Sequence, residues 1–305
     1  MNKENPTHVF VRTIYLFLGT LLCPTLLVQP ANSHERTSRN DPRLPFVETF
    51  TSAHIDASYA NGTSKNSIAI PLGTILPVRL NSTISSAKSR PGQAITGRIM
   101  QDVPLPNGAR IREGSKVIGH IVEVTPATGS ERGRVSLQFD ELTASDQTIS
   151  ITTNLRAIAG FMRILEAQLP PIGPGETDVY RWLTTVQVGG DVVYGDGGVV
   201  TAGGNASEVV GKSVDGGVLG EVKAKDGTEC RGAIYGNDSP QALWIFSSDA
   251  CGTYGLEHIS IANAGRTDPI GVIVLTSDSG NIKIPGGAGM LLRLIENRPN
   301  SKASD

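Results

Sequence analysis

Residues 70–80 read IPLGTILPVRL, and residues 284–294 read IPGGAGMLLRL. Aligned without gaps, the two segments share Ile-Pro at the start, a Gly at the fourth place and Arg-Leu at the end. Because successive side chains of a strand point to opposite faces, alternating apolar residues predict a strand with one buried face. Both segments show this alternation at matching places: Leu76, Val78 and Leu80 in the first, and Met290, Leu292 and Leu294 in the second.

Each segment begins with a turn that contains glycine. A weaker third copy, IREGSKVIGHI, spans residues 111–121 and has its Gly at the same place. Glycine permits the tight backbone turn that residues with a Cβ resist, so four glycines are predicted to hold structural turns: Gly73, Gly92, Gly114 and Gly287. We expect the first and last copies to pair, which would close the domain and remove an exposed edge. The alternative is that I-P-x-G is only a common sequence pattern at the start of a strand.

The region between the copies continues the strand pattern up to about residue 158. In RVSLQFD, residues 134–140, apolar and polar side chains alternate without a break. The segment TISIT, residues 148–152, follows across a short polar stretch and predicts a hairpin. The predicted fold is therefore mainly β, a barrel-like or sandwich domain whose first part spans 68–158.

Residues 159–281 differ in composition and are predicted to form an inserted, glycine-rich β region. Its first ten residues, AGFMRILEAQ, predict a short helix that ends at Leu169-Pro170-Pro171, and Met162, Leu165 and Leu169 are expected to form its buried apolar stripe. Short apolar runs separated by glycine turns follow in residues 189–220. The closing strand is expected at 282–295 and a disordered tail at 296–305, with at most one or two short helices in the whole chain.

The N-terminal region resembles an export signal. Lys3 and Arg12 precede the apolar run IYLFLGTLLCPTLLV, and the small residues Ala-Asn-Ser follow it. This order is typical of a signal peptide, so we predict residues 1–33 as the signal, with cleavage between Ser33 and His34, and 34–67 as a flexible linker. The protein is then exported to the periplasm or beyond, without a membrane span. The alternative is an uncleaved segment that anchors the protein in the inner membrane.

Charge and cysteine content narrow the class of protein. The net charge is −2, with no basic surplus, so no nucleic-acid partner is expected. After signal cleavage only Cys230 and Cys251 remain, and an oxidising compartment permits a disulfide between them. The alternative is a pair of buried free thiols.

The sequence offers no catalytic, metal or cofactor site. His120 and His258 are isolated in strand-like sequence, no G-x-S-x-G segment occurs, and VVGKS at 209–213 lacks the first Gly of a phosphate-binding loop. The spacing of the acids in the glycine turns does not match a calcium loop. These acids are Asp191, Asp196 and Asp215. Core packing is the default role of the aromatic residues Tyr180, Trp182, Tyr194 and Trp244.

Several of these segments together resemble a known family. Pro71-Leu72-Gly73-Thr74, Pro91-Gly92 before ITGRI, Gly114-Ser115, RVSLQF at 134–139 and the last strand at 282–287 follow the order found in TrbI-like periplasmic β-barrel domains of type IV secretion channels. The resemblance covers about residues 68–158 and 282–295, and implies a barrel in the cell envelope. The chain departs from the family in its short linker, its predicted signal peptide and its cysteine-bearing insert.

Three hypotheses for function follow. The leading one is an exported, non-enzymatic envelope protein that acts as a binding or scaffold module, with envelope proteins or a cell-wall polymer as partners. The second, which rests on the resemblance, is a subunit of a transport or type IV secretion-like assembly. The third is an envelope hydrolase that uses carboxylates such as Asp191 or Glu208.

Overall fold

The computed structural model describes residues 68–168, 183–224, 230 and 239–296, all of which belong to one compact unit, Gly62–Asp305. The described part is mainly β and contains one α-helix, which confirms the predicted fold class. Several predicted features lie outside the described residues. They are the signal peptide 1–33, its cleavage site at Ser33 and His34, the linker 34–67 and residues 297–305 of the tail. Among the described residues, no helix is both long enough and apolar enough to cross a membrane.

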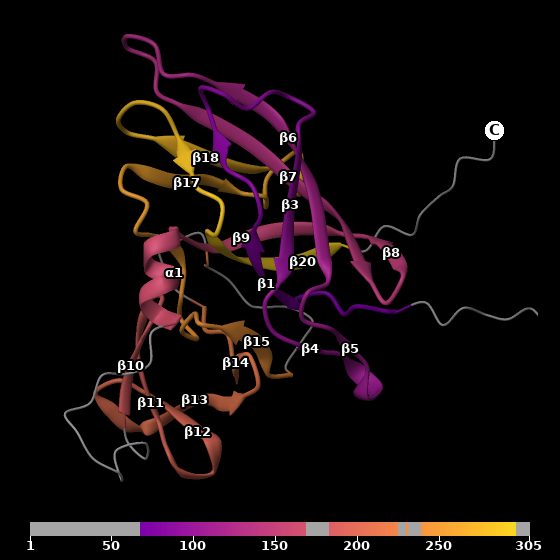
Figure 1. Cartoon of the computed structure of the whole chain (residues 1–305), viewed down its shortest axis with the longest axis vertical. Coiled ribbons are helices and arrows are strands. Elements are labelled where there is room, and N and C mark those ends of the chain that lie inside the picture. The colour runs from indigo at the N-terminus through magenta and orange to yellow at the C-terminus, as the bar shows by residue number, and fades with distance from the viewer. Residues whose placement is uncertain (1–67, 169–182, 225–229, 231–238, 297–305) are drawn as a thin grey trace, which may run out of the picture. The chain divides into compact units, whose positions relative to one another are not determined.

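A ring of antiparallel strands forms the barrel-like domain (Figure 1). Around the ring, β1 pairs with β3, β3 with β6, β6 with β7, β7 with β8, β9 with β20, and β20 again with β1. Strands β8 and β9 are separated only by Ile151, whose N–H donates to the carbonyl of Asp140 at 2.9 Å. The ring strands are β1 (Ile75–Leu80), β3 (Ala94–Ile99), β6 (Lys116–Thr125), β7 (Arg134–Ala144), β8 (Gln147–Ser150), β9 (Thr152–Ala159) and β20 (Gly289–Glu296).

The two copies of the repeated segment pair with each other at the point where the ring closes. The N–H of Gly73 donates to the carbonyl of Leu294, and the N–H of Gly287 donates to the carbonyl of Leu80, each at 2.8 Å. Thus the fourth residue of each copy binds the last residue of the other, about a local two-fold axis. The apolar residues that the repeat predicted to be buried face the main core from both strands. The repeated segment is therefore one turn-and-strand unit that occurs at both ends of the barrel sequence and pairs with its own copy.

Strands β3 and β6 repeat the same arrangement. The N–H of Gly114 donates to the carbonyl of Ile99, and the N–H of Gly92 donates to that of Ile121, again at 2.8 Å. Residues 89–99 are thus a fourth copy of the unit, which the alignment missed because little besides the Gly is shared. The four glycines have φ between 76° and 89°, a left-handed conformation that favours glycine.

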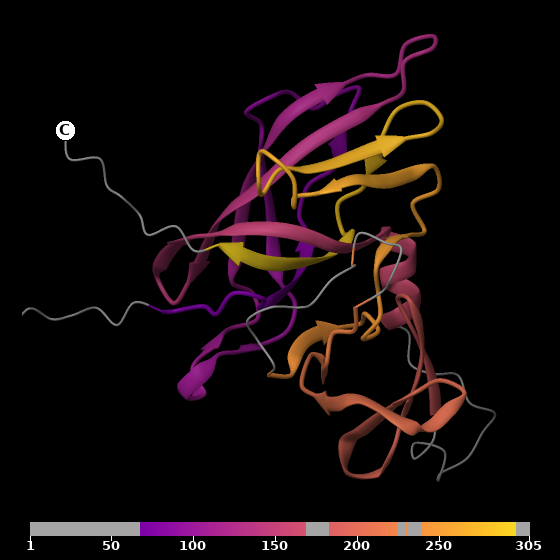
Figure 2. The same cartoon turned by 180° about the vertical axis from the view of Figure 1, so that it is seen from behind.

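Further strands extend the large sheet beyond the ring. The first half of β7 also pairs with β18 (Ile273–Ser277), which pairs with β17 (Ile259–Ala264). On the other side, β16 (Gly252–Tyr254) lies parallel to β9. The outermost strands approach one another, because the hydroxyl of Thr253 donates to the carbonyl of Ile259 at 2.9 Å. Figure 2 shows the yellow C-terminal strand β20 beside β9, within this curled sheet.

The region predicted as one insert is divided between two sheets. Its first part forms a separate six-stranded antiparallel meander, whereas β16, β17 and β18 return to the large sheet. The meander consists of β10 (Leu183–Gln187), β11 (Gly190–Tyr194), β12 (Val199–Ala202), β13 (Asn205–Val214), β14 (Gly217–Gly220) and β15 (Gln241–Trp244). Two short two-stranded pairs complete the described β structure: β2 (Ile84–Ser85) with β19 (Lys283–Ile284), and β4 (Val103–Pro104) with β5 (Arg110–Ile111). Short 3-10 helices occupy Pro106–Gly108 and Asp196–Gly198.

The predicted helix is present as α1 (Phe161–Gln168), but it buries a different face. Its buried residues are Ile164 and Ala167, whereas Met162 and Leu165 are 68% and 42% exposed. The predicted stripe was therefore wrong for these two positions, and Leu169 lies outside the described residues. The helix has apolar residues of its own on more than one side, so its contact with the outer face of the barrel decides which of them are buried.

The barrel and the meander share a second core and two buried glutamines. Ile75 and Leu291, on the outer faces of β1 and β20, pack with Trp244 and Phe246 beyond the barrel. Gln101 accepts from the N–H of Trp244 and donates to the carbonyl of Val218 at 3.1 Å. The side chain of Gln241 accepts from the N–H of Ile75 at 2.9 Å. Strands β1, β9 and β20 are consequently covered on both faces.

Replacing the turn glycines tests the local two-fold pairing. A Cβ at Gly114 would meet nothing within 4 Å, so Gly114→Ala adds only the backbone strain of positive φ, about 1–2 kcal/mol. A Cβ at Gly287 would lie 2.6 Å from the ring of Phe161, so Gly287→Ala should lower the free energy of unfolding by more. Urea unfolding monitored by circular dichroism measures both. Equal stability of Gly287→Ala and the unmodified protein would contradict the role assigned to this turn.

Deleting residues 282–294 tests closure of the ring. Both β1 and β9 would lose their shared neighbour, so the protein should lose its cooperative thermal transition. A truncation that removes only residues 297–305 is the control and should melt like the full chain. A cooperative melt at the original temperature after the larger deletion would show that the domain does not need β20.

Candidate functional site

The best candidate for a ligand site is a groove where the β4–β5 hairpin meets the β13–β14 hairpin. It consists of three adjoining hollows of about 390, 210 and 260 Å³, and Leu219 of β14 lines all three. We call it the Leu219 groove. Its middle is apolar and rich in proline, with Pro104, Leu105, Pro106 and Pro240 beside Leu219.

One end of the Leu219 groove is acidic. Asp102, Glu113 and Asp215 line it together with Arg110. Arg110 lies 2.8 Å from one carboxylate oxygen of Asp102, and the other oxygen accepts from the backbone N–H of Glu113 at 2.8 Å. Three carboxylates therefore face one guanidinium, which leaves this end with an excess of negative charge.

The opposite end is apolar with mixed charge. Val209 and Val210 line it with Lys212 and Glu221, and the side chain of Val209 is 64% exposed. Single exposed apolar residues are common on protein surfaces, so Val209 matters here only because it adjoins the apolar middle of the groove. The groove thus offers an apolar floor between two ends of different charge.

Glycines place the β13–β14 hairpin close to the barrel. Gly217 has φ 155°, and a Cβ there would lie 2.5 Å from the carbonyl oxygen of Trp244. A Cβ at the preceding Gly216 would lie 3.5 Å from Gln101. The DGG turn at 215–217 therefore allows the hairpin to approach the end of β3, and this approach forms one wall of the groove.

The two histidines of the ordered sequence lie away from the groove. Nδ1 of His120 is 2.9 Å from Asp140, and Nδ1 of His258 is 2.8 Å from Asp278; all four side chains are substantially exposed. Neither pair lines the Leu219 groove. No group of three His, Cys, Asp or Glu side chains in the described part of the chain could hold a metal ion.

The acids considered for calcium or for hydrolysis are dispersed. Asp191 is the second residue of β11, and Asp196 lies in a 3-10 turn. Asp215 lines the acidic end of the groove, and Glu208 forms an ion pair with Lys223. The VVGKS segment lies within β13 rather than in a loop before a helix. These four acids therefore do not come together in one site of the kind that calcium binding or hydrolysis would need.

The aromatic candidates serve packing where the structure describes them. Trp244 is 3% exposed, and its ring centroid lies 6.3 Å from that of Phe246 in the second core. Tyr194 accepts a hydrogen bond from Gln187 at 3.2 Å, and burial raises the pKa of its phenol. Tyr180 and Trp182 lie outside the described residues.

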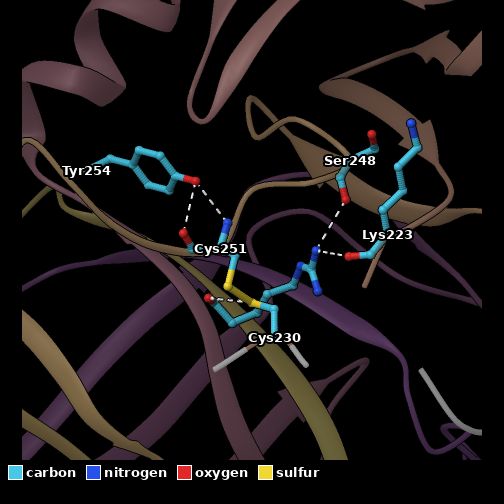
Figure 3. The surroundings of a disulfide bond; sticks show 6 residues. Lys223, Cys230, Ser248, Cys251 and Tyr254 are labelled. Carbon is cyan, nitrogen blue, oxygen red and sulfur yellow. Dashed lines mark hydrogen bonds between the residues drawn. A yellow bond between two sulfur atoms is a disulfide. The ribbon is translucent and has the colours of Figure 1, made fainter. Parts of the chain in front are cut away.

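Cys230 and Cys251 form the predicted disulfide (Figure 3). The hydroxyl of Tyr254 accepts from the N–H of Cys251 at 2.9 Å and donates to its carbonyl at 3.0 Å. Cys251 immediately precedes β16, which pairs with β9. The bond therefore ties the chain after β14 to the outer part of the large sheet.

Comparisons of this chain with models of protein families, with curated proteins and with solved structures found no match. The Leu219 groove is therefore defined by its geometry alone. Leu219 and Leu105 were not predicted as site residues, although PLPNG and DGGVLG mark two turns, with Leu105 in the first and Leu219 in the strand that follows the second.

Replacing both cysteines by serine tests the structural role of the disulfide. Opening a loop of 21 residues should lower the free energy of unfolding by about 3 kcal/mol in the chain-entropy model. The comparison is urea unfolding of the oxidised protein and of the Cys230→Ser/Cys251→Ser variant, with and without reductant. Only the unmodified protein should respond to reductant, and equal midpoints in all four conditions would contradict a stabilising role.

Proposed function

We propose that this protein is an exported binding module of the bacterial cell envelope, without catalytic activity, and that the Leu219 groove holds its ligand. The observation that carries the proposal is the groove itself. It combines an apolar floor around Leu219 with an acidic end at Asp102, Glu113 and Asp215. Apolar surface supplies affinity, whereas a few placed polar groups supply orientation.

Export is supported by two independent features. The first is the order of charged, apolar and small residues at the N-terminus. The second is the disulfide, which persists in oxidising compartments. Both fit a periplasmic or extracellular protein.

A binding role is also supported by how the groove is built. Its walls belong to the β4–β5 pair and to the meander, and Gln101, just before β4, hydrogen-bonds to Val218 and Trp244 of the meander. A groove with such fixed walls loses little conformational entropy when a ligand binds. Envelope proteins and a cell-wall polymer are the two partner classes that we propose.

The alternative proposal is a subunit of a transport or type IV secretion-like assembly. It is supported by the resemblance of residues 68–158 and 282–295 to TrbI-like barrels. A ring-like oligomer in mild detergent would favour this alternative, whereas a soluble monomer would count against it.

Crosslinking in cells tests the groove with matched variants. Val209→Arg places a charge in the groove, and Ile270→Arg makes the same kind of change at a side chain that is 51% exposed and does not line the groove. We expect Val209→Arg to reduce the recovered crosslinked partner by about tenfold, since burying an unpaired charge in a contact is costly. Ile270→Arg should leave recovery unchanged.

A second variant, Asp215→Lys, reverses one charge at the acidic end of the groove. If partner recovery depends on this end, it should fall in Asp215→Lys as well. Equal recovery of the same partner from the unmodified protein and all three variants would place the binding surface elsewhere.

A further inference from the structure

Unpartnered polar atoms gather on the outer face of strands β9 and β20. Among the described residues, four buried side-chain nitrogen or oxygen atoms have no hydrogen-bond partner. One is the hydroxyl of Thr201 in the meander, and the other three are Oδ1 of Asn154, Nε of Arg156 and Nε of Arg293. Buried polar groups are nearly always satisfied, so three unsatisfied atoms in one place require an explanation.

Strand pairing brings these three residues together. Asn154 of β9 is directly opposite Arg293 of β20. Leu155 pairs with Leu292 and Ala157 pairs with Leu291, so β9 has one residue more than β20 between these two pairs. Arg156 is thus the extra residue of a β-bulge. Such bulges redirect a side chain and are frequent beside functional sites.

Arg156 and Arg293 are positively charged groups in a part of the protein that is largely shielded from water. Arg156 is 2% exposed, and its Nη2 donates to the carbonyls of Lys223 and Ser248. Burial, and then the nearby charge of Arg293, lowers the pKa of Arg156 to about 10, so it stays charged at neutral pH. Burial also lowers the pKa of Arg293, as does the charge of Arg266.

No carboxylate of the described residues compensates this charge directly. Neither Arg156 nor Arg293 forms an ion pair within the described part of the chain. Asp249 acts on Arg156 only at longer range, and its carboxylate accepts a hydrogen bond from Ser247 at 2.9 Å. Water could satisfy the three atoms, but it would leave two neighbouring cations without an opposite charge.

We propose that Asn154, Arg156 and Arg293 bind a small oxyanion, specifically a phosphate group. The two unpartnered Nε–H groups would donate to phosphate oxygens, as guanidinium groups commonly do. Oδ1 of Asn154 would accept from the hydroxyl of hydrogen phosphate, which suits phosphate better than sulfate. The site lies outside the Leu219 groove and does not depend on the function proposed for that groove.

Calorimetric titration of the oxidised full-length protein with inorganic phosphate tests the proposal. The buffer contains no other oxyanion, and sodium chloride keeps the ionic strength constant. We expect one phosphate to bind per chain, and Arg293→Gln to weaken binding by about tenfold or more through loss of a charge-assisted hydrogen bond. Arg79→Gln removes the same charge from the outer face of β1 and should bind phosphate normally.

Two further ligands identify the source of the phosphate group. Dimethyl phosphate represents the phosphodiester of a polymer or lipid and lacks the hydroxyl, so weaker binding than that of inorganic phosphate would assign the site to free phosphate. Equal binding of dimethyl phosphate would assign it to a phosphodiester. Sulfate tests the acceptor role of Asn154 and should bind more weakly than phosphate.

Asn154→Asp distinguishes an anion site from a purely structural cluster. The new carboxylate lies beside two arginines and should replace the bound anion. The melting temperature without phosphate should therefore equal or exceed that of the unmodified protein, and phosphate should no longer raise it. The proposal is overturned if the unmodified protein does not bind phosphate, or if Arg293→Gln binds it as tightly as Arg79→Gln does.

Discussion

The pairing of β1 with β20 is the interaction on which the rest of the structure depends. Gly73 and Gly287 each donate a backbone hydrogen bond to the last residue of the opposite copy, so the two ends of the barrel sequence hold one another in register. Because a shift of one residue would turn every apolar side chain outward, this register also determines which residues form the core. The same device recurs between β3 and β6, through Gly92 and Gly114. The barrel is therefore built from four related turn-and-strand units that pair two by two.

Closure of the barrel creates an outer face that has to be covered. Ile75 and Leu291 point away from the barrel interior and would be exposed if the barrel stood alone. The α1 helix and the chain around Trp244 cover them, and the glutamines at 101 and 241 supply hydrogen bonds at the junction. The Leu219 groove lies beside one of these glutamines, because Gln101 precedes Asp102 and donates to the carbonyl of Val218, which precedes Leu219.

The same covered face contains the arginine cluster. A charged residue on a strand buried on both faces is costly unless its charge is compensated. All eight residues of β9 are buried, and Arg156 is among them. Its two backbone carbonyl partners satisfy part of the guanidinium, and an anion would supply the charge that the described residues do not. The structure thus contains an acidic groove end and a buried basic cluster, two regions of opposite charge.

The sequence by itself predicted the strands of the barrel-like domain, the turn glycines, the pairing of the repeated copies and the disulfide. These features depend on local rules: period-two alternation, the conformational freedom of glycine at positions such as 73 and 287, and the single way in which two cysteines can pair. Only the tertiary structure decided which face of α1 is buried, because the helix has apolar residues on more than one side, and whether Ile164 or Met162 is buried depends on what lies opposite.

The Leu219 groove and the arginine cluster could not be predicted from the sequence either. Leu105 and Leu219 are 114 residues apart in the chain, and Asn154 and Arg293 are 139 apart, so only long-range pairing brings them together. One local signal was present, the single arginine in the apolar strand TTNLRAIA, but its meaning depends on the bulge and on Arg293 across the sheet.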